Sequence, residues 1–170
     1  WTAARFAFLV LAASRDVLAL FARPNLYPVN FGGWTAAAIA SRAQLARMPA
    51  DSVLVADNFM LAAELEFALD ARHPVFALDH RINAKFVRAL QLRLWQRDEA
   101  ALSAQKDHPM LVVVDESALD WQLHEPWNAP LCALFPGLRA LDEPIVDSDS
   151  KRFQLVRHLP GDSCYCPAPP

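Results

Sequence analysis

The chain has 170 residues, of which 54% are hydrophobic and 21% are charged. This composition is enough for one buried core, and it excludes a mainly disordered, collagen-like or coiled-coil chain. Sixteen basic and nineteen acidic residues give a net charge of −3, so the chain as a whole lacks the positive charge typical of nucleic-acid-binding proteins, and we expect no nucleic-acid partner.

The first part of the chain is predicted to be helical and unusually apolar. Residues 1–23 favour a helix whose apolar residues nearly encircle its axis, a pattern typical of burial against protein or lipid. Residues 24–33 are a turn-rich connector, and residues 34–48 are a second predicted helix. We therefore expect a helix and connector over 1–33, a single α/β domain over 34–163, and a frayed Pro-rich tail over 164–170.

From residue 52 onward, short apolar runs alternate with helical periods. Strands are predicted over residues 52–56, 74–78 and 110–114, and helices over 58–70 and from Asn83 onward. Continuous apolar strands joined by helices are typical of a parallel sheet covered on both faces. Residues 138–146 and 152–158 then predict an antiparallel hairpin at a sheet edge. The fold class predicted is α/β: a Rossmann-like sheet with parallel core strands, helices on both faces and a C-terminal hairpin.

Each of the three predicted parallel strands ends in an aspartate. These are Asp57, Asp79 and Asp115, and each is followed by another polar residue, Asn58, His80 or Glu116. In open parallel sheets ligands bind outside the carboxyl ends of the strands, so one interpretation is a ligand or metal site. The other is that these side chains cap the helices that follow, which requires no ligand and is the simpler explanation for Asp57 and Asp115.

A basic segment follows the second predicted strand. Arg81, Lys85 and Arg88 have the spacing i, i+4, i+7, which places them on one face of a helix. Such a face can hold a phosphate or lie against anionic lipid headgroups, although most charge runs are simply solvated. On the same helix Gln91 and Trp95 offer a hydrogen-bonding group and a stacking surface for a sugar.

Residues 54–69 and 75–95 resemble the soluble C-terminal domain of bacterial membrane glycosyltransferases of the GT-C superfamily, related to protein O-mannosyltransferases and the lipid A aminoarabinose transferase. The resemblance rests on Asp57-Asn58, on Ala62 to Leu65 with Phe67, on the turn 78–80 with Asn83, and on residues 91–95. It departs from the family at Phe59, where tyrosine is expected, and at residues 86–90, which replace a small, Gly-containing basic stretch.

This resemblance implies a periplasmic domain of an inner-membrane enzyme that moves a sugar from a polyprenyl-phosphate carrier to a lipid or protein acceptor. The catalytic acid of such enzymes lies in a loop outside this chain, so no catalytic residue is expected here, and residues 1–33 become the juxtamembrane helix and connector. The expected partners are the membrane body of the same polypeptide and, through the candidate binding residues, the carrier-linked sugar and acceptor. Those candidates are Asp57, Asn58, Asp79, His80, Asn83, Lys85, Arg88, Gln91, Trp95 and Asp115.

Two alternatives remain open from the residues alone. In a small Rossmann-like enzyme, Asp57, Asp79 and Asp115 bind Mg²⁺ and direct phosphoester hydrolysis or transfer. In a sugar-binding module, Asp57, Asn58, His80 and Trp95 surround one pocket. For the transferase domain itself we expect neither a metal nor a cofactor.

Overall fold

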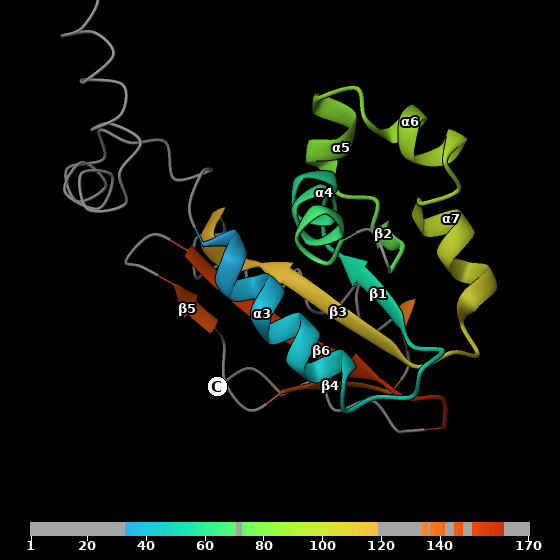
Figure 1. Ribbon diagram of the computed structural model, residues 1–170. Coiled ribbons are helices and arrows are strands. Elements are labelled where there is room, and N and C mark those ends of the chain that lie inside the picture. The colour runs from blue at the N-terminus through green and yellow to red at the C-terminus, as the bar shows by residue number, and fades with distance from the viewer. Residues whose placement is uncertain are drawn as a thin grey trace, which may run out of the picture.

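The computed structural model describes residues 33–70, 73–118, 134–135, 137–141, 145–147 and 151–161. The expected helix over residues 1–23, the connector up to residue 32 and the tail over 164–170 lie outside this described part. Within it the chain forms helices and strands in the α/β class that the sequence predicts, with a mixed sheet (Figure 1).

The elements follow one another in a largely alternating order. The helices are α3 (Trp34–Leu45), α4 (Phe59–Ala68), α5 (Arg81–Lys85), α6 (Ala89–Leu94) and α7 (Glu99–Leu102), with short 3₁₀ turns η2 (Ser103–Gln105) and η3 (Glu116–Ala118). The strands are β1 (Val53–Ala56), β2 (Val75–Ala77), β3 (Met110–Asp115), β4 (Leu138–Ala140), β5 (Ile145–Asp147) and β6 (Lys151–His158).

The described strands form one six-stranded sheet in the order β2-β1-β3-β6-β4, with β5 also paired to β6. β1 runs parallel to both β2 and β3, which confirms the predicted parallel core. The predicted antiparallel hairpin is present as β5 and β6. Its expected position at the edge is wrong for β6, which also pairs along its length with β3 and therefore lies inside the sheet. Apart from Asp115, β3 is apolar, and it is buried along the whole length over which it pairs with β6.

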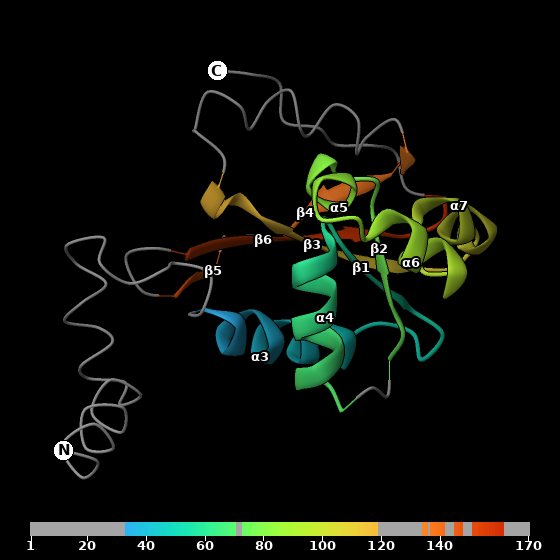
Figure 2. The same ribbon diagram turned by 90° about the horizontal axis from the view of Figure 1, so that it is seen from above.

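The core consists of side chains on the two faces of the sheet. On one face, α3 and α4 contribute Ala37, Leu61 and Leu65, which pack on strand residues such as Leu111 and Phe153; Figure 2 shows both helices on that side. On the other face, Leu102 of α7 joins a second cluster with strand residues including Val112. Helices α5 and α6 lie near β2.

One predicted helix is wrong. The spacing predicts a continuous helix from Asn83 past Leu94, but the structure has two short helices, α5 and α6, separated at Val87. Val87 adopts a left-handed φ of 57°, and the N–H groups of Val87 and Arg88 donate to Ala84 and Asn83. These two bonds satisfy the last carbonyls of α5 in a Schellman motif and end the helix. In a continuous helix from Asn83 the spacing of Val87, Leu90 and Leu94 predicts that these residues share one side, and in the structure all three are exposed.

Candidate functional site

The ends of β1 and β3 lie side by side because these strands are parallel neighbours. Asp57 directly follows β1 and Asp115 ends β3, so the sheet brings these two predicted residues to the same edge, as expected. β6 runs antiparallel to β3, which places its first residue, Lys151, at this edge as well. Two acids and one lysine therefore meet at the carboxyl edge of the parallel strands.

Asp57 is only 2% exposed, and the chain itself satisfies its oxygens. Its Oδ2 accepts a hydrogen bond from the backbone N–H of Asp115 at 3.1 Å, and its Oδ1 accepts one from the Asn58 side-chain amide at 2.7 Å. Burial, and then the nearby negative charge of Asp115, raise the pKa of Asp57 to about 8. At neutral pH Asp57 therefore retains its proton, in a place sealed from solvent.

Asp115 is held by a buried lysine. Its Oδ2 lies 2.9 Å from Lys151 Nζ, and the two side chains are 7% and 3% exposed. The other oxygen accepts a hydrogen bond at 2.9 Å from the backbone of Ser117 in η3. The ammonium of Lys151 also lies 4.0 Å from the ring centroid of Trp34 in α3. This arrangement joins β3, β6 and the start of α3, so its evident role is to fix the fold.

The capping interpretation is confirmed for Asn58 and wrong for Asp57. Asn58 Oδ1 accepts from two N–H groups in the first turn of α4, those of Met60 and Leu61. Asp57 instead accepts across the sheet edge, as described above. Asp115 caps the turn η3 through Ser117. A cap needs a side-chain acceptor on the residue just before the helix, and that position is held by Asn58 and not by Asp57.

His80 caps α5 through its ring. Its Nδ1 accepts from the backbone N–H of Ile82 at 3.2 Å. Burial, followed by the charge of Arg81, lowers the pKa of His80. A neutral imidazole is the form that can accept this hydrogen bond, so the lowered pKa and the cap are consistent.

Asn83, Asp79 and Lys85 lie in separate surroundings. The buried Asn83 side chain accepts from the Phe59 backbone at 3.0 Å and donates to the Leu78 carbonyl at 2.7 Å, which joins the first turn of α4 to the end of β2. Asp79 is exposed, and its backbone N–H donates to Glu99 at 3.0 Å. Lys85 is exposed on α5. The role of Asn83 in the structure is therefore to hold α4 and the end of β2 together.

A groove between α4 and α6 gathers three more of the predicted residues: Arg88, Gln91 and Trp95. The groove has a volume of about 260 Å³, and at the start of α6 the Arg88 guanidinium donates to the Gln91 side chain at 2.8 Å. The Arg88 guanidinium also lies 6.0 Å from the Phe59 ring centroid. An aromatic ring, a guanidinium and an amide are thus presented together. The groove is lined by Phe59, Ala62, Ala63, Glu66, Val75, Arg88, Gln91, Leu92, Trp95 and Arg97.

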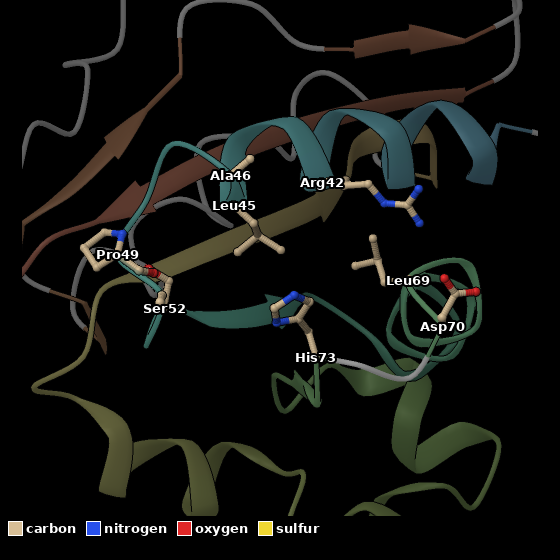
Figure 3. Close-up of a pocket in the computed structure, with 9 residues that line it drawn as sticks. Arg42, Leu45, Ala46, Pro49, Ser52, Leu69, Asp70 and His73 are labelled. Atoms are coloured by element: carbon tan, nitrogen blue, oxygen red, sulfur yellow. The ribbon is translucent and has the colours of Figure 1, made fainter.

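A second pocket, of about 380 Å³, lies beside the start of β1, at the edge of the sheet opposite the carboxyl edge that holds Asp57 and Asp115. Arg42 extends from α3 toward the end of α4, where it donates to the Ala68 carbonyl at 2.8 Å, and His73 lies across the opening (Figure 3). Sequence reasoning missed this pocket, because its residues come from three separate segments with no shared motif. Its lining residues are Arg42, Leu45, Ala46, Pro49, Ala50, Ser52, Leu69, Asp70 and His73.

Lys151 is the other residue that the sequence did not reveal, together with the ion pair of Arg152 and Glu116. In that pair Arg152 Nε lies 2.9 Å from Glu116 Oε2. Both pairs depend on β6 lying beside β3, a contact between residues far apart in the chain. The sequence did carry a signal for these pairs: Lys151 and Arg152 begin β6, and the acids Asp115 and Glu116 stand at the end of its partner β3 and directly after it.

In the described part of the chain, no group of three or more His, Cys, Asp or Glu side chains is arranged to hold a metal ion. Nor is any helix there long and apolar enough to span a bilayer. Comparison with known proteins finds no matching family model, curated protein or solved structure.

Proposed function

We propose that this chain is a non-catalytic domain of a bacterial membrane glycosyltransferase that moves a sugar from a polyprenyl-phosphate carrier to a lipid or protein acceptor. In this proposal the domain lies on the periplasmic side of the inner membrane and is attached to the membrane body of the same polypeptide. Its task is to contact the carrier-linked sugar or the acceptor through the groove between α4 and α6.

The observation that supports this proposal is the position of the groove. The resemblance to the transferase domains lies in residues 54–69 and 75–95. In the fold these two segments form β1 with α4 and β2 with α5 and α6, and the groove lies between α4 and α6. The two segments that carry the resemblance therefore also supply most of the lining of one open cavity.

The chemistry of the groove suits a sugar phosphate. Trp95 is 59% exposed, so its ring can stack on the apolar face of a sugar. Arg88 presents a guanidinium group, which can bind phosphate oxygens with two parallel hydrogen bonds. Gln91 adds an amide that can both donate to and accept from hydroxyl groups.

The strand order β2-β1-β3, with helical connections between parallel strands, also supports the finer assignment of a Rossmann-like, doubly wound layer with helices on both faces. In such a layer the ends of β1 and β3 are the usual ligand site. Here Lys151 already supplies the positive charge beside Asp115 that Mg²⁺ supplies in a phosphoester hydrolase. For this reason we favour the groove over the carboxyl edge as the binding site.

A nuclear magnetic resonance titration of the 170-residue chain with a farnesyl phosphate sugar tests the proposal. We expect the Trp95 indole N–H signal and the backbone signals of Arg88 and Gln91 to shift together, and Trp95→Ala to weaken binding about tenfold, the loss of one stacking contact. Phe67→Ala is the matched control, since Phe67 is an aromatic residue of α4 that is 83% exposed and outside the groove lining. Shifts confined to the carboxyl edge, or none, would contradict the proposal.

A further inference from the structure

The segment from residue 80 to residue 97 differs in charge from the rest of the chain. It contains five basic residues and no acidic one, although the chain as a whole carries a net charge of −3. Among them Arg93 is 75% exposed, with an acceptor 3.7 Å away at Asp98 just beyond the segment. The basic residues are Arg81, Lys85, Arg88, Arg93 and Arg97.

The same segment exposes large apolar side chains. Leu90 is 68% and Leu94 81% exposed, and they share one face of α6 because they are four positions apart in the sequence. Phe86, Val87 and Trp95 are also more than half exposed. We call these five residues the α5–α6 face. A surface helix of a soluble domain normally exposes polar residues to water, so an exposed apolar face of this kind indicates an interaction surface.

Helix α6 already has a separate core contact. Leu92 is buried and belongs to the cluster beneath α3 and α4. Leu90 and Leu94 therefore do not contribute to this core; they point the other way, into solvent. Next to them Val87 holds a left-handed φ of 57°, an uncommon conformation for a β-branched residue. The chain thus keeps an exposed valine in a strained conformation between two short helices.

We propose that the α5–α6 face docks on an anionic lipid bilayer. Exposed Leu, Phe and Trp with interspersed Lys and Arg are the composition of helices that lie in a membrane interface, apolar side inserted and cations at the headgroups. The complete lack of acidic residues over 80–97 matches an anionic surface, to which each basic residue adds attraction. A second copy of this chain docked through the same face would bring its five basic residues against those of the first, and this repulsion opposes such a dimer.

This orientation places the groove at the membrane surface. Trp95 belongs both to the face and to the groove lining, and Arg88 lies one residue from Val87. A lipid-linked ligand in the bilayer would therefore reach the groove without leaving the interface. The docking itself goes beyond the proposed function, because it requires no sugar, carrier or transferase activity.

Flotation of the 170-residue chain with vesicles tests the inference. We expect binding to vesicles of phosphatidylcholine mixed with phosphatidylglycerol, weaker binding to phosphatidylcholine alone, and a decrease as salt is added. Leu90→Ser with Leu94→Ser should lower the partition coefficient at least about tenfold. Lys85→Gln with Arg93→Gln should lower it about fivefold for each charge removed, and only on the anionic vesicles.

The controls are substitutions of the same kind elsewhere on the surface. Phe67→Ser removes an exposed apolar residue of α4, and Arg47→Gln with Lys106→Gln removes two exposed cations. Both should leave partitioning unchanged. Binding that the α5–α6 variants reduce no more than the controls do would overturn the inference, because another segment would then be responsible. A change from dimer to monomer in the Leu90 and Leu94 variant, without vesicle binding by the parent chain, would overturn it in favour of a second copy.

Discussion

Replacing the buried lysine at the carboxyl edge, Lys151→Met, should strongly destabilise the domain. The ammonium lies 2.9 Å from Asp115, and both side chains are almost fully buried. Removing one member of such a pair leaves an uncompensated charge in a low dielectric, which costs about 3–5 kcal/mol. Methionine retains most of the volume of the lysine stem, so packing against Trp34 changes little. The loss of stability then measures the removal of the positive charge beside Asp115.

The assay is urea unfolding at pH 7, followed by far-ultraviolet circular dichroism. Lys106→Met is the matched control: Lys106 is exposed, and its replacement should change the free energy of unfolding by less than about 0.5 kcal/mol. Adding Asp115→Asn to the Lys151 variant removes the unpaired charge and should restore a large part of the lost stability. A loss below about 1 kcal/mol for Lys151→Met would refute the assignment of this pair as a buried structural contact.

Three further predictions concern stability, each measured by urea unfolding. Because the pKa of Asp57 is raised to about 8, the folded state holds its proton where the unfolded state has lost it, so the contribution of this group to stability falls as pH rises. Between pH 5 and pH 8 the fall is up to about 4 kcal/mol, and Asp57→Asn should remove that slope; an unchanged slope would show another group responsible. Gly33→Ala should lower the free energy of unfolding more than Gly161→Ala. Both glycines have a left-handed φ, but of these two only Gly33 has a neighbour in the way, because its new Cβ would lie 2.7 Å from the side chain of Lys151. Equal losses of stability would argue against this close approach. Val87→Gly should raise the free energy of unfolding by about 1 kcal/mol, because glycine adopts a left-handed φ without strain. Gln96→Gly, at a similar φ but replacing a residue that is not β-branched, should raise it less. The reverse order would contradict the claim that Val87 is strained.

The parallel core was predictable because its strands are buried on both faces. Val53–Ala56 and Met110–Asp115 lack polar alternation, which is typical of parallel strands covered on both faces. Because β1 and β3 run parallel, their carboxyl ends lie at the same edge, so the proximity of Asp57 and Asp115 was predictable as well. Their environment did not follow, because Lys151 arrives from a strand far along the chain.

The break at Val87 was not predictable from helical periodicity. Valine seldom occupies the left-handed region, so nothing in residues 83–94 signals the end of α5. Hydrophobic spacing also predicted that Leu90 and Leu94 share one side, which is confirmed, but not that this side faces solvent. Periodicity shows which residues share a face, whereas the partner of that face depends on the rest of the fold.

The predicted grouping of ten candidate residues divides into distinct places. Asp57 and Asp115 are tied up by buried contacts at the carboxyl edge, Asn58 and His80 cap helices, and Asn83 links two elements. The residues that line an open groove are Arg88, Gln91 and Trp95. In the structure the better candidates for ligand binding are therefore Arg88 and Trp95, at the two ends of α6, and Gln91 within it, rather than the carboxylates that the sequence made prominent.

The reading frame that encodes this chain gives the most direct test of the proposal that it is part of a membrane glycosyltransferase. Sequenced upstream of the codon for Trp1, it should contain roughly ten or more apolar stretches of about 20 residues each, the length of a membrane-spanning helix. A start codon immediately before Trp1, with no such stretches, would contradict the assignment and favour an independent soluble protein.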